Sequence, residues 1–370
     1  AGKSPVCSLD LASPTRVGAT FRPPVNFERG AATGRGSANA VMPGGRSDLV
    51  VAGYTTRNAR QVSYFARLDP SLSLIFEREL ASPDGNDEEA IGLAVYPGLG
   101  AHILLKRPTS TVTATYNWDM TYKHGEWVAP PGHKWSAVSY GAASLVAAGS
   151  ANGRATMSWS RESDFIEEGD VFLRSEARAV RAISRERVLL AGFAERGTGN
   201  AVFVGEIDRG APTPVWVFSE GNPDAPKGQT AATSVSRDRL GNVVVGGTMG
   251  IDNAGATHWY LTKLTASGKQ IWAQLDGAPT GRSGVNSVAV AADDDFVAAG
   301  YLERPDGVHP VLRRYSPGGE LRWERALPPM PLAAAAAQMK AVTVDTDGGI
   351  VVAGQRPENR GGLWVRKYFQ

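Results

Sequence analysis

Cysteine is almost absent from this sequence, since the only one among 370 residues is Cys7. One thiol excludes an internal disulfide and any zinc site that needs several cysteines. No run of 18 apolar residues occurs, so the sequence predicts no transmembrane segment. Charge of one sign is also lacking: 39 basic residues face 37 acidic ones, without a basic run or a charged tail. This balance argues against a nucleic acid as partner.

Sequence motifs of common catalytic sites are missing as well. The chain has no GxSxG nucleophile motif, no HExxH zinc motif and no glycine-rich phosphate loop between a strand and a helix. The glycine-rich segment 29–38 lacks the lysine of a phosphate loop, and we interpret it as a flexible connector. The sequence therefore predicts no catalytic residue, no cofactor and no metal, and it favours a protein that is not an enzyme.

The sequence does contain a short hydrophobic segment that recurs seven times, which we call the hydrophobic phrase. The copies end at or near these residues: Gly53, Lys106, Gly149, Gly192, Gly247, Gly300 and Gly354. Six copies contain a small residue followed by glycine, and only the copy at 102–106 departs. The last three glycines are 53 and 54 residues apart. A period of roughly 50 residues, built from strand-like phrases, is typical of a β-propeller.

The copy of the unit at 286–327 indicates what each unit builds. It contains four strand-like segments separated by turn-forming Asp, Pro and Gly, at 287–291, 295–302, 309–315 and 320–327. The last copy has three such segments before Gln370. The strand-like stretch 16–25 can supply the fourth, which would close the ring and remove exposed sheet edges.

The sequence thus predicts an all-β fold, a seven-bladed β-propeller of four-stranded antiparallel blades closed by an N-terminal strand. Because the repeat uses nearly the whole chain, we predict one domain over 1–370. The predicted blades span 37–83, 87–132, 134–176, 178–221, 229–277, 284–328, and 338–370 together with 16–25.

Two recurring residue types are predicted to be structural. Trp127, Trp216, Trp272 and Trp323 share one place in the repeat, the fourth strand. We expect each to pack between blades rather than to form a carbohydrate platform. The aspartates at 293–295, 345 and 347 fall between first and second strands, where Asp accepts hydrogen bonds from its own turn. We therefore interpret them as turn residues rather than metal ligands.

A ring of candidate ligand-binding residues follows from the repeat, because first strands line the central channel of a propeller. Counting back 14 residues from each phrase glycine gives Asn39, Trp135, Arg178, Thr233, Asn286 and Lys340, with Glu89 as the counterpart in blade two. Arg178 and Lys340 would repel a calcium ion, so an anionic ligand or an acidic loop of a partner fits this channel mouth better. The alternative is a solvated plug of polar side chains.

Blade two departs from the repeat and is rich in aromatic residues over 116–135. Trp118, Tyr122 and His124 lie there, next to Trp135. Aromatic faces with polar edges stack on sugars and on cations, so these residues extend the candidate binding site. The alternative is a degenerate blade refilled with large side chains.

The amino-acid sequence of the repeat resembles that of a known family. GNVVVGGT at 241–248, followed by the segment 258–272, is similar to the bacterial β-propeller repeat of exported and cell-surface proteins, and 50–56, 63–73 and 310–323 echo it. The resemblance implies a propeller scaffold for binding or surface display, located outside the cytoplasm. It is specific for fold and weak for function.

We therefore expect a non-catalytic, monomeric binding or surface-display module that recognises a partner protein, or an anionic or glycan ligand, at the channel mouth. Two alternatives stay open. One is a hydrolase or lyase acting at the central channel through Arg178, Lys340 and a histidine, His124 or His133. The other is a lectin, which would expose aromatic residues on several blades.

Overall fold

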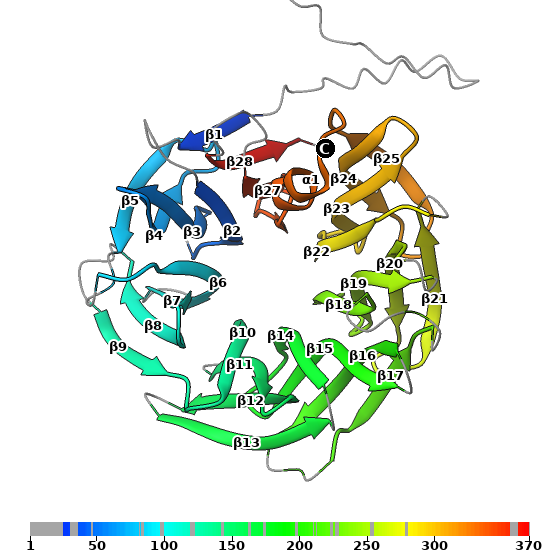
Figure 1. Cartoon of the computed structure of the whole chain (residues 1–370), viewed down its shortest axis with the longest axis horizontal. Helices are drawn as coiled ribbons and strands as arrows, with labels where there is room; N and C mark the ends of the chain where they lie inside the picture. The colour runs from blue at the N-terminus through cyan, green and yellow to red at the C-terminus, as the bar shows by residue number, and fades with distance from the viewer. Residues whose placement is uncertain are drawn as a thin grey trace, which may run out of the picture.

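Seven four-stranded antiparallel sheets surround a common centre in the computed structural model of this chain (Figure 1). The structure describes residues 25–29, 36–45, 47–80, 82, 85–96, 100–118, 123–141, 144–161, 164–172, 175–196, 199–209, 211, 213–222, 225, 229–251, 255–277, 280–355 and 362–369. The predicted seven-bladed β-propeller is confirmed. In each blade the first strand lies innermost and the fourth outermost (Figure 1).

The first four blades contain these strands: β2 (Gly36–Pro43), β3 (Leu49–Arg57), β4 (Arg60–Leu68) and β5 (Leu74–Leu80); β6 (Glu89–Tyr96), β7 (Gly100–Lys106), β8 (Thr111–Asn117) and β9 (Lys123–Val128); β10 (His133–Gly141), β11 (Ser144–Ala151), β12 (Arg154–Arg161) and β13 (Asp164–Phe172); β14 (Ser175–Ala182), β15 (Arg187–Arg196), β16 (Gly199–Asp208) and β17 (Trp216–Glu220).

The remaining strands are β18 (Ala231–Arg237), β19 (Val243–Gly250), β20 (Thr257–Leu264) and β21 (Gln270–Asp276); β22 (Gly284–Val290), β23 (Phe296–Arg304), β24 (Gly307–Tyr315) and β25 (Leu321–Ala326); and β26 (Ala341–Val344), β27 (Ile350–Gln355), β28 (Leu363–Tyr368) and β1 (Val25–Arg29). A short helix, α1 (Leu332–Gln338), precedes β26. Among the described residues, no helix has the length and apolar character needed to cross a membrane.

The recurring glycine of the hydrophobic phrase has a steric cause. A Cβ on Gly53, in the second strand β3, would overlap the carbonyl oxygen of Ser37 in the first strand β2. Second-strand glycines in four other blades meet a first-strand carbonyl in the same way: Gly149, Gly192, Gly247 and Gly300. Glycine is therefore selected where two backbones approach most closely.

An N-terminal strand closes the ring, as predicted. β1 pairs antiparallel with β28 and is the outermost strand of the seventh blade. Phe27 packs against a core cluster that blade seven shares with blade one. Of the predicted segment 16–25, only Val25 belongs to the described residues, and the observed strand continues from it to Arg29.

The hydrophobic core consists of layers between neighbouring blades, and the outer tryptophans belong to these layers as predicted. Trp272 in blade five stacks on Phe296 in blade six, with ring centroids 5.3 Å apart. Trp127 in blade two stacks on Trp135 in blade three at 5.0 Å. Trp216 in blade four lies against Gly268, in the turn between the third and fourth strands of blade five. Each tryptophan thus joins its blade to the next.

We expect removal of residues 1–29 to lower the midpoint of thermal unfolding by about 10 °C and to cause aggregation, because β28 would become an open sheet edge. Differential scanning calorimetry and light scattering measure both effects. Glu28→Gln, which changes one side chain of β1 and keeps its backbone, should melt like the unmodified chain. A truncated chain that melts unchanged and stays monomeric would contradict closure by β1.

Two glycines with nearly equal φ angles allow the effect of backbone strain on stability to be measured separately from the effect of a steric clash. Gly268 and Gly348 have φ values of +80° and +79°, but only at Gly268 would a Cβ meet another side chain, the Trp216 ring. Gly348→Ala should destabilise by about 1 kcal/mol through backbone strain alone. Gly268→Ala should destabilise by about 1–3 kcal/mol more, because the tryptophan must move. Equal urea-unfolding free energies for the two variants would refute the packing of Trp216 on this turn.

Candidate functional site

The ring has two ends that differ in the connections they carry. Because strands alternate in direction, the turns between first and second strands and between third and fourth strands lie at one end, which we name the turn face. The links between blades and the turns between second and third strands lie at the other end, the link face. The predicted channel-mouth residues lie near the start of each first strand, and therefore toward the link face.

Most predicted ring residues occupy one structural position, a β-bulge. In six blades the pairing of first and second strands shifts by one residue. The residues at the bulge are Asn39, Ile91, Ser136, Arg178, Thr233 and Asn286, and Lys340 stands at the corresponding place just before β26. Five of the seven predicted residues are in this set. A bulge leaves its extra residue unpaired in the ladder, so its side chain is available for other contacts.

Trp135 and Glu89 are not at the bulge, and the placement of Trp135 on the channel is wrong. Its side chain is 1% exposed and lies in the core between blades two and three. The hairpin that joins β10 to β11 is shorter by one residue, so counting back 14 residues from Gly149 reaches Trp135 instead of Ser136. Glu89 precedes the bulge residue Ile91 by two positions.

Polar bulge residues hold the inner strands together. In three blades the bulge side chain donates to the carbonyl of the residue that precedes the next blade's bulge position. These bonds are Asn39 Nδ2 to Ala90 O at 2.8 Å, Thr233 Oγ1 to Val285 O at 2.6 Å, and Asn286 Nδ2 to Met339 O at 3.0 Å. Ser234 Oγ and Ser287 Oγ accept from backbone amides of the following blade, at 3.0 and 3.1 Å. The predicted ligand ring is therefore in large part a set of bonds between blades.

Lys340, Asn39 and Glu89 are brought together from blades seven, one and two. Lys340 Nζ donates to Asn39 Oδ1 at 2.8 Å, and Asn39 Nδ2 donates to Glu89 Oε1 at 2.9 Å. Desolvation lowers the pKa of Lys340, Glu89 opposes this effect, and Lys106 adds to it. Arg178 is not part of this group, because it pairs with Glu176 at 3.3 Å and lies over the ring of Phe193.

Of the three aromatic residues predicted to extend the site, only Trp118 has a described side chain, and it packs on the side of blade two away from Trp135. Trp118 is half-buried and packs against the core between blades one and two, with the Arg67 guanidinium 5.2 Å from its ring centroid. Tyr122 lies outside the described residues. Of His124, only the backbone in β9 is described.

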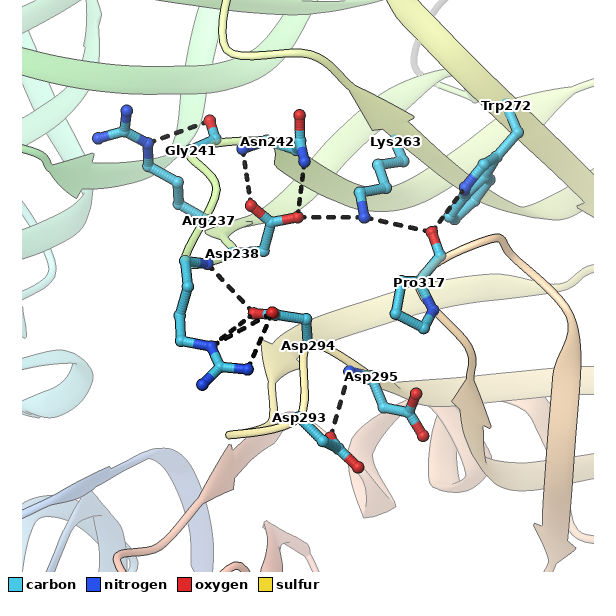
Figure 2. A network of polar contacts seen from close by, with 11 residues as sticks. Arg237, Asp238, Gly241, Asn242, Lys263, Trp272, Asp293, Asp294, Asp295 and Pro317 are labelled. Atoms are coloured by element: carbon cyan, nitrogen blue, oxygen red, sulfur yellow. Dashed lines mark hydrogen bonds and ion pairs between the residues drawn. The ribbon is translucent and has the colours of Figure 1, made fainter.

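The turn face of blades five and six is held by a network of charged contacts (Figure 2). Asp238 accepts from the amide of Asn242 at 2.8 Å and pairs with Lys263 at 3.1 Å. Lys263 Nζ also donates to the carbonyl of Pro317 in the next blade, at 3.2 Å. Lys367 repeats this arrangement between blades seven and one, with Asp345 at 2.5 Å and the carbonyl of Pro70 at 2.8 Å.

The prediction that the recurring aspartates are turn residues is confirmed. Asp293 accepts from the amide of Asp295 at 3.2 Å, and Asp345 accepts from the amide of Asp347 at 3.0 Å. Asp294 pairs with Arg239 of the preceding blade at 3.0 Å (Figure 2). Within the described part of the chain, no group of three or more His, Cys, Asp or Glu side chains is placed to hold a metal ion.

The sequence analysis missed a second group of inner-strand residues, near the turn face: Tyr96, Tyr140, Arg181 and Arg237. These four residues end, or nearly end, the first strands β6, β10, β14 and β18. Three positions after the bulge, blades three, five and seven carry Ser139, Ser236 and Thr343, whereas blade four carries Arg181. Blade one carries Met42 at this position, so the repeat in the sequence alone does not single out Arg181.

Comparison with known proteins shows the fold. No protein-family model matches the sequence, and no curated protein matches it. Sqt1 from Chaetomium thermophilum, solved bound to the N-terminus of ribosomal protein L10, is similar at 13% identity and a TM-score of 0.54, over 90% of this chain and 97% of that one. A further structure of Sqt1 has 13% identity and a TM-score of 0.55, over 94% of this chain and 98% of that one. The Dos1 propeller has 9% identity and a TM-score of 0.54, over 94% of this chain and 95% of that one. At these identities the chain shares the propeller fold with Sqt1 and Dos1.

The Asp238–Lys263 pair should make stability depend on pH. Burial favours the neutral acid, yet hydrogen bonds from Asn242 and Lys263 outweigh it and lower the pKa of Asp238 below its ordinary value of 3.8. The stabilisation is therefore complete above pH 3.8 and is lost as the pH falls through the folded-state pKa. Asp238→Asn should reduce the unfolding free energy by about 3 kcal/mol at pH 7, because Lys263 stays buried without its counter-charge.

Urea unfolding at pH 7, 5 and 3 tests this expectation. The difference between the unmodified protein and Asp238→Asn should shrink at pH 3. Asp347→Asn, at an exposed turn position, is the matched control and should change stability by about 0.5 kcal/mol or less. A difference that is constant from pH 7 to pH 3 would contradict the role assigned to the Asp238 carboxylate.

Proposed function

We propose that the chain is a non-catalytic propeller that binds a partner protein on its turn face. The observation that carries this proposal is Leu240. Its side chain is 79% exposed, the highest value among the large apolar side chains of the described residues. It stands in the turn between β18 and β19, where the end of the ring faces solvent.

The surroundings of Leu240 suit a binding anchor because the turn that carries it is fixed. Asp238, two residues before, is bonded to Asn242 and Lys263. Arg239, one residue before, pairs with Asp294 in the next blade. A side chain presented by a rigid backbone loses little freedom when a partner covers it, which favours affinity.

Two further facts support binding over the alternatives. Sqt1, which has the same fold, is known bound to a segment of another protein, so a ring of this type can act as a binding scaffold. A lectin would expose aromatic residues on several blades, but Trp127 and Trp272 are stacked on buried rings. A hydrolase acting through Lys340 would need a free ammonium group, and this one already donates to Asn39.

The proposal extends to location and assembly. The similarity of the repeat text at 241–272 to the repeats of exported and cell-surface proteins supports a place outside the cytoplasm. The closed ring supports a monomer, because closure removes the sheet edges through which open arrays associate.

Leu240→Ser tests the proposed function. The full chain is immobilised, proteins retained from extracts and surface fractions of the producing cell are identified, and the retained protein is then purified. Its affinity is measured by calorimetry for the unmodified chain, Leu240→Ser and Leu321→Ser. We expect about tenfold weaker binding for Leu240→Ser, as for loss of an apolar anchor.

Leu321 is the matched control, a leucine 49% exposed on the outer strand β25. Its substitution should leave the affinity unchanged, and both variants should melt like the unmodified protein. Equal affinity for all three chains would refute docking on the turn face. Turnover of esters or lactones that depends on Lys340 would replace the binding proposal with the hydrolase alternative.

A further inference from the structure

Four side chains from four consecutive blades stand at the turn-face ends of the inner strands, around the centre of the ring. They are Tyr96 from blade two, Tyr140 from blade three, Arg181 from blade four and Arg237 from blade five. We name them the arginine–tyrosine cluster. The first strands that carry them lie side by side around the centre (Figure 1), and β14 contacts both β10 and β18.

The two arginines of the cluster differ from several arginines of the middle strands, which form ion pairs. Arg181 forms no ion pair or hydrogen bond with any described residue, and the only such contact of Arg237 is from Nε to the carbonyl of Gly241, at 3.1 Å (Figure 2). Elsewhere, guanidinium groups have carboxylates close by: Arg67 with Asp48 at 2.7 Å, Arg107 with Glu88 at 2.7 Å, Arg187 with Glu206 at 3.0 Å, Arg313 with Asp276 at 2.6 Å, and Arg314 with Asp295 at 2.8 Å.

Arg181 and Arg237 are also close enough to repel each other. Desolvation lowers the pKa of Arg181, and the charge of Arg237 lowers it further. Arg181 is exposed at the end of β14, and both guanidinium groups leave most of their N–H donors unused by described residues, so these donors are open to a ligand. An oxyanion between them would accept from both and remove the repulsion.

The tyrosines give this place an apolar side. The rings of Tyr96 and Tyr140 lie 4.5 Å apart, and Tyr140 lies 5.4 Å from the ring of His102. Burial and the hydrogen bond with Tyr96 raise the pKa of Tyr140 to about 12, and burial lowers the pKa of His102 to about 4. The rings of Tyr140 and His102 are therefore uncharged at neutral pH. On blades two and three, which precede the two blades that carry the arginines, the rings offer contact area for the methylene groups of a side chain that carries a carboxylate.

We infer that the arginine–tyrosine cluster binds a segment of the partner protein that is rich in Asp and Glu. The inference rests on the proposed function and assigns the chemistry of the partner. Guanidinium forks match carboxylates in shape, and the tyrosine rings cover the aliphatic part of a glutamate.

A peptide segment fits better than a nucleic acid. Nucleic acids need unneutralised cations along a continuous path. On the turn face around the cluster, the neighbouring cations are already neutralised, Arg239 by Asp294, Arg187 by Glu206 and Lys263 by Asp238. The unneutralised positive charge is therefore local, and it matches a short acidic segment.

A fluorescein-labelled hexaglutamate peptide is the probe, and its binding to the full chain is followed by fluorescence anisotropy at low salt. Arg181→Gln and Arg237→Gln should each weaken binding about tenfold, as for loss of one charge-assisted pair. The affinity of Arg181→Lys should lie between that of the unmodified chain and that of Arg181→Gln, because lysine keeps the charge but lacks the two-pronged guanidinium group. Arg57→Gln, which removes an exposed arginine on the link side of blade one, should bind like the unmodified chain.

The variants should fold, because Arg181 has no partner to lose, and their melting temperatures check this. Peptide binding that ignores Arg181 and Arg237, or no binding at all, would overturn the inference. Tighter binding of an oligothymidylate of equal charge, with the same dependence on the arginines, would overturn it in favour of a nucleic acid. Leu240→Ser affects only retention of the partner protein, so a failure of the peptide test and a failure of the proposed function are separate results.

Discussion

Seven first strands converge at the centre of the ring, and there a Cβ on Gly53 would overlap the carbonyl oxygen of Ser37. This crowding of backbone explains several features at once. In five blades it requires glycine in the second strand, and in these blades it accompanies a bulge in the first strand, which frees one side chain from the ladder. Where that side chain is Asn39, Thr233 or Asn286, it bonds to the next blade. The residues that looked like a ligand ring in the sequence are thus placed by a packing constraint.

The same constraint explains how far the sequence could predict the structure. Crowding selects residue type at fixed intervals, so the glycine phrase predicted the number of blades, and the count of strands predicted closure by an N-terminal strand. Side-chain contacts between blades leave no such periodic signal. Trp135 was misplaced because one hairpin is a residue shorter, a change that shifts side chains along the strand without altering the repeat. The bond from Lys340 to Asn39 joins residues 301 positions apart, and no local pattern predicts it.

The two ends of the ring use their polar residues differently. Toward the link face, three bulge residues are bonded to the next blade, and Lys340 is linked to Glu89 through Asn39. At the turn face, the Asp238–Lys263–Pro317 and Asp345–Lys367–Pro70 chains fix the turns of neighbouring blades while leaving Leu240 outside. Rigid turns with an exposed apolar side chain favour association, whereas bonded polar residues favour stability of the ring. The turn face is for this reason the better candidate for contact with a partner.

The pairing of charges gives a second, independent argument that a partner binds at the turn face. Several arginines of the middle strands, among them Arg67, Arg313 and Arg314, reach carboxylates at hydrogen-bond distance. Arg181 and Arg237 have no such partner among the described residues, and the strands that carry them, β14 and β18, contact each other. The ring can stay folded without ion pairs at these two arginines, because the core layers between its blades do not depend on them. Two neighbouring arginines without carboxylate partners favour the binding of an anionic group, which is the chemistry inferred for the partner segment.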